Sequence, residues 1–588
     1  MNNKIANITL DLENCEEKFQ DFLLGINAEI TRKGFFGGLS AEMLNNRKFF
    51  AGEKFPDGWE CSGCEWIINQ PEKSLCKSKF VVIQNGEIRQ SSDSIALQEN
   101  VKYNVRIWVK AYAEIVNVTY GVEGYTKTTE VIRNEEPYTE LFFSFTALCT
   151  GLEKFVVRAE GCLAIFEVSL MPTENFYGMR WDVIEHLRTI APTSIRFPGG
   201  CCADHFDWKE SLKAPEFRKP ADGSSKWFLF RDTYNQDCLD IGLHEFMMLC
   251  KELRTEPEYT VSLLLSDGED ARQLVEYCNG SAETEFGAMR QSLGYDPFHI
   301  RLWYVGNEAY FFGGETYQHS TAAALRTNEL IHAMRQADDT ILTVVGLTWS
   351  DAFKPWNYDF VAHLDCRYEY VSYHNYVGIL PDPSQGQNGL ATCEMLEKNF
   401  MDGEDAGLNF YKNELFGDKF RNIRVCADEW NYSWGYGSSN ALFFSNALQL
   451  HFFAKYAEKY HIDRAEFFMP VNEGMITVQG TETKLESTGE MFRLMQHHCG
   501  GQIIRCRTDI SELDILCTRR EGDAFFMSVI NRSAVPCRLC LEGYDIRDCR
   551  EIHTGEFSFE SNEWELIFPE ETVVSGHSML FVSFVPKK

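Results

Sequence analysis

The feature that most constrains the fold is a repeated alternation of short apolar segment, loop and amphipathic helix over residues 173–498. Seven of the apolar segments have the length and composition of buried strands: 193–197, 259–264, 300–305, 341–345, 370–373, 423–426 and 465–468. Helices with apolar residues at i, i+3 and i+4 lie between them, for example at 321–335 and 441–460. An earlier apolar run at 22–29 supplies an eighth strand. Eight such units predict an α/β protein built on a (β/α)8 TIM barrel.

Two stretches of the chain have strand texture without helices. Residues 59–172 alternate over short segments separated by turn residues, which predicts a β-sandwich inserted after the first barrel strand. Residues 499–588 predict a C-terminal β-sandwich, and residues 1–17 a strand that joins it. The first barrel strand and its loop then occupy 18–58, with residues 39–44 expected to be helical, and the rest of the catalytic barrel occupies 173–498.

Charge and cysteine usage narrow the class of protein. A formal net charge of −31 argues against nucleic acid and anionic membranes as partners, because such an acidic surface would be repelled by them. No stretch of 18 apolar residues predicts a membrane helix, and the first residues lack a secretory signal. The 20 cysteines are then expected to be free thiols in the cytoplasm. Cys61 and Cys64 form a CxxC without a second ligand pair, so no metal site is predicted.

Two of the predicted strands end in a glutamate. Functional residues of a barrel gather at the C-terminal ends of its strands, and Glu308 and Glu429 hold this position after the fourth and seventh strands. Two carboxyl groups that face one cavity suit glycoside hydrolysis, in which one donates a proton and the other attacks the anomeric carbon. Their mutual repulsion and partial burial are expected to raise one of the two pKa values. The alternative is a pair of surface glutamates in salt bridges, which fits the aromatic-rich setting poorly.

Other strand ends carry polar residues as well. Arg196 precedes a double glycine that would let the backbone approach a ligand, although a tight turn with a structural arginine is an alternative. His374 and Tyr376 are two residues apart in a strand, so both can point to the same side. A buried, hydrogen-bonded histidine without a catalytic role is the alternative for His374. Glu29 ends the first strand and is expected to bind sugar hydroxyls.

Several short motifs together resemble one known family. Gly306-Asn-Glu308, Asp428-Glu-Trp-Asn431, the Arg-Phe-Pro-Gly-Gly of residues 196–200 and His374-Asn-Tyr376 are similar to motifs of glycoside hydrolase family 51, the α-L-arabinofuranosidases of clan A. The stretch 38–49 is similar to the first loop and helix of that family. The resemblance implies a retaining exo-glycosidase that releases terminal arabinofuranosyl residues. It further implies a homo-oligomer and no cofactor or metal.

The resemblance also implies roles for individual residues. Glu308 would be the acid/base and Glu429 the nucleophile. Asn307 would bind the substrate 2-hydroxyl, Glu29 would bind furanose hydroxyls, and His374 and Tyr376 would orient the nucleophile. The remaining residues expected at the substrate are Arg196, Cys201 and Trp430.

Two departures from the family pattern keep other functions open. Cys201 stands where many members have asparagine, and Met469 stands where a polar contact was expected. They motivate a second hypothesis, a β-xylosidase, an endo-glucanase or another pentofuranosidase. A third hypothesis is a catalytically inactive carbohydrate-binding protein. The inserted domain resembles a carbohydrate-binding domain, but a structural or oligomer-building role is equally compatible with its sequence.

Overall fold

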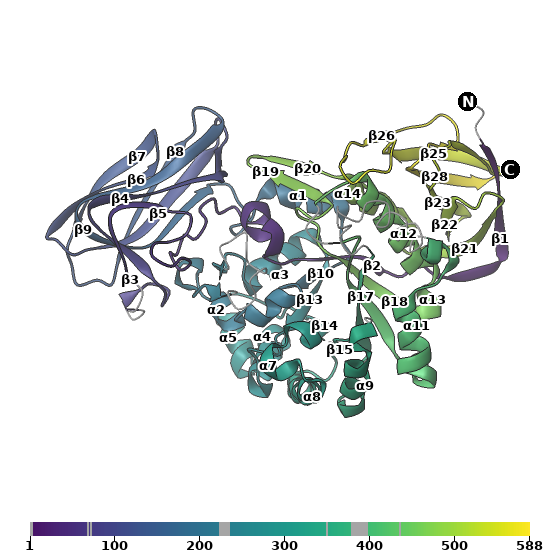
Figure 1. Cartoon of the computed structure of the whole chain (residues 1–588), viewed down its shortest axis with the longest axis horizontal. Helices are drawn as coiled ribbons and strands as arrows, with labels where there is room; N and C mark the ends of the chain where they lie inside the picture. The colour runs from purple at the N-terminus through teal and green to yellow at the C-terminus, as the bar shows by residue number, and fades with distance from the viewer. Residues whose placement is uncertain are drawn as a thin grey trace.

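The computed structural model describes residues 4–67, 70, 73–222, 236–348, 351–377, 398–433 and 437–587. Three bodies follow one another along the long axis of the molecule: a strand-rich domain, a barrel surrounded by helices, and a second strand-rich domain beside which both chain ends lie (Figure 1). Each body has a hydrophobic core of its own.

Eight parallel strands form the closed central barrel, and this confirms the predicted fold class. β2 pairs with both β10 and β18 and so closes the ring, with Ile26 opposite Ile195 on one side and Phe467 on the other. The strands, in the order of the ring, are β10 (Ser194–Phe197), β13 (Glu256–Val261), β14 (Leu302–Val305), β15 (Leu342–Val345), β16 (Tyr370–Tyr376), β17 (Arg424–Asn431), β18 (Ile462–Phe467) and β2 (Phe22–Asn27).

Helices surround the barrel. The longer ones are α1 (Trp181–Ile190), α3 (Leu243–Leu253), α4 (Gly268–Asn279), α5 (Glu285–Ser292), α8 (Ser320–Ala337), α9 (Lys354–His363), α12 (Asn440–Lys455) and α14 (Ser487–Met495). Single-turn helices are α2 (Trp208–Ser211), α6 (Ala309–Phe312), α7 (Gly314–Tyr317), α11 (Ala406–Asn409) and α13 (Ala457–Tyr460). None of the described helices combines the length and hydrophobicity that crossing a lipid bilayer would require.

The inserted domain lies between the first and second barrel strands. Its seven strands form one sheet that folds over a common core, because the long strands β4 and β9 pair along most of their length and carry the others. They are β3 (Glu60–Ile67), β4 (Phe80–Leu97), β5 (Lys102–Ala111), β6 (Ile115–Val122), β7 (Tyr125–Ile132), β8 (Thr139–Thr146) and β9 (Gly151–Pro172).

The C-terminal domain is a nine-stranded sheet that includes the start of the chain. β1 (Lys4–Lys18) lies inside this sheet, antiparallel to β21 and parallel to β24. The other strands are β21 (Gln502–Thr508), β22 (Leu513–Arg520), β23 (Ala524–Asn531), β24 (Cys537–Cys540), β25 (Tyr544–His553), β26 (Glu565–Ile567), β27 (Val573–Val574) and β28 (Ser578–Pro586). Two small hairpin-like pairs complete the described strands: β11 (Ala221–Asp222) with β12 (Gln236–Asp237), and β19 (Ile476–Gln479) with β20 (Glu482–Leu485).

The prediction of a helix over residues 39–44 is wrong. A single irregular turn, η2 (Phe35–Leu39), ends where that helix was expected to begin, and Ser40 is already extended. The Glu42 carboxylate accepts hydrogen bonds from the backbone N–H groups of Met43 and Leu44 at 3.0 and 3.1 Å. Such local side-chain bonds compete with helical ones, and here they hold the chain in a non-helical path toward the inserted domain.

Candidate active site

Glu308 follows β14 in an unusual backbone conformation. It has φ +42° and ψ +44°, the left-handed region that residues with side chains rarely adopt. The chain can turn there because Gly306, at φ +76°, sits where an added Cβ would lie 2.5 Å from Leu263. Strained residues of this kind persist where the surrounding structure fixes them, often at functional sites.

Glu429 is part of β17 and faces the same space as Glu308. One carboxylate oxygen of Glu308, one of Glu429 and a ring nitrogen of His374 all lie within 4.8 Å of one another. The side chain of Glu308 is 21% exposed and that of Glu429 is 7% exposed, so the pair is shielded yet reachable from one side. The two glutamates that the sequence singled out therefore meet at one site.

Glu429 is held by two side chains from other barrel strands, Tyr376 from the adjacent β16 and Arg196 from β10. The guanidinium of Arg196 donates to Oε1 at 2.9 Å, and the Tyr376 hydroxyl donates to Oε2 at 2.9 Å. Arg196 is fully buried at the end of β10 and its second terminal nitrogen donates to Asn307 Oδ1 at 2.7 Å. These bonds fix the orientation of the carboxylate toward the pocket.

His374 lies between the two glutamates. Its Nδ1 is 2.8 Å from Glu308 Oε1 and 3.4 Å from Glu429 Oε2, while its Nε2 is 3.4 Å from Asp428 Oδ2. Burial disfavours charge on the ring, but Glu429 and Asp428 outweigh it and raise the pKa of His374 well above its usual value. This direction favours the charged imidazole, whose ring nitrogens lie within 3.4 Å of three carboxylates.

The two glutamates differ in proton affinity. Burial, reinforced by the charges of Glu308 and Glu29, raises the pKa of Glu429 to about 6, although His374 and Arg196 act in the opposite direction. Burial alone would also raise the pKa of Glu308, but hydrogen bonds from His374 and Tyr310 outweigh burial and lower this pKa. One pKa of the pair is raised, but it is that of Glu429, the predicted nucleophile, and not that of Glu308, the predicted acid.

The double glycine brings the first barrel strand close to the pair. The Gly200 N–H donates to Glu29 Oε2 at 3.0 Å. A Cβ on Gly199 would overlap Glu29, and a Cβ on Gly200 would overlap the Glu429 carboxylate. Glu29 is also held by the hydroxyl of Thr31, so it lies at the pocket with a fixed side chain.

Asn307 and Cys201 also belong to the pocket. Among the described residues, the buried Asn307 Nδ2 has no hydrogen-bond partner, so this N–H group is available for a ligand. Cys201 lies near Glu29, Glu429 and Glu308 and is half-buried. A hydrogen bond with Cys202 lowers the pKa of Cys201, but burial and these carboxylates outweigh it. The pKa of Cys201 is therefore raised, and its thiol stays protonated.

Trp430 is not brought together with the other predicted site residues. Its side chain is fully buried, with ring centroids 5.3 Å from Phe453, 5.1 Å from Phe467 and 6.0 Å from Phe492. Neighbouring residues of a strand point to opposite sides, so Trp430 faces the helices while Glu429 faces the pocket. This position does not support the predicted contact between Trp430 and the substrate.

Three residues of the site were not predicted. Asp428 accepts a hydrogen bond from the Tyr373 backbone N–H at 3.0 Å, and despite burial the charges of Arg196 and His374 lower its pKa to about 2. Asn27 donates to the Asp428 carbonyl oxygen at 2.7 Å. Tyr310 donates to Glu308 Oε1 at 3.1 Å. Tyr310 follows Glu308 by two residues in an aromatic loop, which was the available signal in the sequence.

The spacing of Glu308, His374 and Glu429 would also suit a metal ion. In this arrangement His374 Nδ1 is in hydrogen-bond contact with Glu308 Oε1 at 2.8 Å, and Arg196 and Tyr376 donate to Glu429, which suits an acid–base site.

Comparison with known proteins agrees with this geometry. Residues 186–378 match the family model "Alpha-L-arabinofuranosidase 1 domain". The chain is 24% identical to Alpha-L-arabinofuranosidase 2 of Arabidopsis thaliana over 52% of each protein. It is 24% identical to Intracellular exo-alpha-(1->5)-L-arabinofuranosidase of Streptomyces lividans, over 65% of this chain and 62% of that protein. The chain thus spans about half to two thirds of the length of these two relatives.

Solved structures extend the likeness to the whole fold. The GH51 arabinofuranosidase from Xanthomonas axonopodis pv. citri superposes with a TM-score of 0.63 over 99% of both chains, at 15% identity. That of Thermotoga petrophila gives 0.55 over 70% of this chain and 91% of its own, at 18% identity. By sequence over much of its barrel and by fold over its whole length, the chain resembles the α-L-arabinofuranosidases of glycoside hydrolase family 51.

Proposed function

We propose that the chain is a retaining glycoside hydrolase that removes terminal α-L-arabinofuranosyl residues from short oligosaccharides or plant glycosides. The observation that carries the proposal is the separation of the two carboxylates, with one oxygen of each within 4.8 Å of the other. Retaining enzymes hold their two carboxyl groups about 5–5.5 Å apart, whereas inverting enzymes need about 6.5–9.5 Å to admit a water. Relatives from Streptomyces lividans and Bacillus subtilis are named intracellular exo-α-(1→5)-L-arabinofuranosidases, which supports exo-action on arabinofuranosides.

In the first step Glu429 attacks the anomeric carbon and Glu308 protonates the leaving oxygen. Arg196 and Tyr376 hold the Glu429 carboxylate, and its attack forms a glycosyl ester. The proton that Glu308 gives to the leaving oxygen is the one shared in the hydrogen bond between His374 Nδ1 and Glu308 Oε1. In the second step Glu308 takes a proton from water, which attacks the ester and releases arabinose with retained configuration.

The remaining pocket residues have binding roles in this proposal. The unpartnered Asn307 Nδ2 would donate to the 2-hydroxyl of the sugar, and Glu29 would accept from furanose hydroxyls. The protonated thiol of Cys201 would line the same sugar. Action in the cytoplasm fits the 18 cysteines whose side chains the structure describes, which are free thiols. From the family resemblance we further propose a homo-oligomer.

The roles of the two glutamates can be separated with azide. We expect Glu308→Ala to lose roughly 10²–10⁴-fold in rate on a glycoside with a poor leaving group. It should keep more activity on nitrophenyl α-L-arabinofuranoside, and azide should accelerate it and yield a glycosyl azide of retained configuration. Glu429→Ala should lose turnover on both substrates, while Glu482→Ala, an exposed glutamate on β20, serves as the control. A retained azide product from Glu429→Ala would contradict the assignment.

Substrate class is tested with a panel of nitrophenyl glycosides and the anomer of the first product by NMR. We expect the arabinofuranoside to be preferred and the first product to be the α-anomer. Preference for a xylopyranoside or glucopyranoside would favour the second hypothesis. Tight arabinose binding without turnover would favour a carbohydrate-binding protein.

A further inference from the structure

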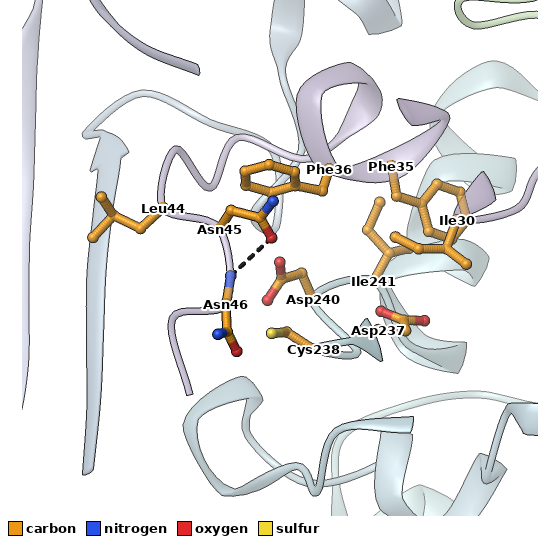
Figure 2. A pocket seen from close by; sticks show the side chains of 10 residues that line it. All are labelled: Ile30, Phe35, Phe36, Leu44, Asn45, Asn46, Asp237, Cys238, Asp240 and Ile241. Atoms are coloured by element: carbon orange, nitrogen blue, oxygen red, sulfur yellow. Dashed lines mark hydrogen bonds between the residues drawn. The ribbon is translucent and has the colours of Figure 1, made fainter. Parts of the chain in front are cut away.

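The small cavities beside the active site are too narrow for a sugar. One is lined by Asp237, Cys238 and Asp240, with Phe36 and Asn45 on its other side, and holds only about 10 Å³ (Figure 2). That volume is close to the minimum for a single water molecule. Phe36 and Asn45 also line a much larger space.

A cleft of about 840 Å³ lies between the inserted domain and the barrel. The loop after β2 forms one part of it with Lys33 and Phe36, and the inserted sheet contributes residues of β4 and β5. The start of α1 and the β19–β20 hairpin form the barrel side, which in Figure 1 lies toward the inserted sheet. Ligand sites commonly have volumes of about 300–1,000 Å³ and occur between domains, so the cleft has the size and place of a binding site.

The lining of the cleft suits a neutral, hydroxyl-rich ligand. Trp181 lines it and is 37% exposed, so an aromatic side chain that could contact the C–H surface of a sugar ring is partly open to the cleft. Within the described part of the chain, the side chains of Asp93, Lys102 and Gln479 line the cleft and form no hydrogen bond or ion pair. The charged residues that line the cleft are of both signs, which disfavours a strongly charged ligand.

The walls of the cleft are held by buried hydrogen bonds of Glu42 and by partly exposed contacts of Arg180. Glu42 accepts from the Ser169 hydroxyl at 2.7 Å and from the Leu170 N–H at 3.0 Å, which ties the β2 loop to β9. Arg180 pairs with Asp182 and donates to the Gly480 carbonyl at 3.0 Å, which ties α1 to the hairpin. A cleft with fixed walls loses little entropy when it binds a ligand.

The loop after β2 joins this cleft to the active site. Glu29 and Arg32 lie on its catalytic side, where they are 3.9 Å apart, and Lys33 and Phe36 line the cleft. We propose that the cleft is a second carbohydrate-binding site, which takes a neutral pentose oligosaccharide between the inserted domain and the barrel. The identity of the sugar, though not the site itself, rests on the proposed arabinofuranosidase function.

The test compares a substrate that fills only the catalytic pocket with one long enough to reach a second site. We expect Trp181→Ala to weaken the binding of arabinopentaose by about tenfold in calorimetry and to raise its KM by a similar factor. The same variant should leave kcat/KM for nitrophenyl α-L-arabinofuranoside unchanged. Tyr177→Ala is the matched control, because Tyr177 is exposed and packs on the same Phe176 ring as Trp181 but does not line the cleft.

If Trp181→Ala does not fold, Asp93→Ala and Lys102→Ala carry the same expectation from the opposite wall. Arabinopentaose binding that none of these variants weakens overturns the cleft as a site. If the wild type cleaves no furanoside, the proposed function fails. The cleft proposal then stands only if the wild type still binds arabinopentaose and Trp181→Ala weakens that binding; an absence of binding overturns it.

Discussion

Gly199 and Gly200, directly after β10, determine how closely the backbone approaches Glu29 and Glu429. A side chain at either position would overlap Glu29 or Glu429. At Gly200 the requirement for glycine is steric. Gly199 has the same steric requirement and in addition has φ +94°, a conformation in which only glycine is unstrained. The sequence indicated a backbone that approaches a ligand, and the structure shows that it first approaches the carboxylates.

Gly200→Ala should therefore act on catalysis. We expect kcat/KM to fall at least about 10²-fold, because displacement of a reacting group by about 1 Å has this effect. Gly346→Ala, where an added Cβ has open space and no positive φ is required, should leave kcat/KM near the wild-type value. Steady-state kinetics with nitrophenyl α-L-arabinofuranoside compare the two, and full activity in Gly200→Ala would show that the carboxylate can move aside without loss.

The raised pKa of Glu429 has a consequence for the pH dependence of activity. Glu429 must be ionised to attack, so kcat/KM should fall as the pH drops below about 6 rather than near the ordinary carboxyl value. The alkaline limit should lie well above 6.5, where the proton on His374 is lost. Arg196→Gln removes a cation that favours the ionised carboxylate and should shift the acid limb to higher pH. An acid limb at pH 4.5 in the wild type would contradict this account.

Among the elements, α12 is a helix as predicted but is buried more completely than its sequence indicated. Its sequence was predicted as an amphipathic helix, yet every residue from Asn440 to Ala454 is buried. The C-terminal sheet covers the side that would otherwise face water, and that packing depends on contacts distant in sequence. His451 Nδ1 lies 2.5 Å from Asp514 Oδ1 on β22, and Lys455 donates to the other oxygen.

Asp514 thus links the barrel to the C-terminal domain. Burial disfavours its charge, but Lys455 and His451 outweigh burial and lower its pKa. Since the folded pKa is depressed, its contribution to stability is present at neutral pH and is lost as the pH falls through that value. We expect Asp514→Ala to lower the free energy of unfolding by about 3–5 kcal/mol, because it leaves Lys455 without its buried partner. Denaturant unfolding measures this, with the exposed Asp548→Ala as a control that should change little.

Periodicity predicted all eight barrel strands but not their ends. The strands that carry His374, Tyr376 and Glu429 run three and five residues further than their apolar segments, because polar residues at the barrel mouth keep strand pairing. The site residues were predictable where a motif marked a strand end. Asp428 and Asn27 could not be assigned roles, since their contacts depend on how neighbouring strands align across the ring.

At the scale of the whole molecule, the start of the chain belongs to the C-terminal domain. β1 lies between β21 and β24, so its loss would divide the nine-stranded sheet and expose two unpaired edges. We expect deletion of residues 1–18 to lower the melting temperature and to promote aggregation, measured by calorimetry and light scattering. Deletion of residues 1–3 is the control, and a fully stable protein after the longer deletion would refute the structural role of β1.

The position of β2 in the ring also has a consequence for biosynthesis. β2 is the first barrel strand to leave the ribosome, but one of its two neighbours, β18, follows more than 430 residues later. At about 5–20 residues per second, translation of that interval takes tens of seconds. During this time the nascent barrel has an open seam, while the inserted domain, whose strands pair only with one another, can already be complete. Chaperone protection of the growing chain would therefore be needed most along that seam.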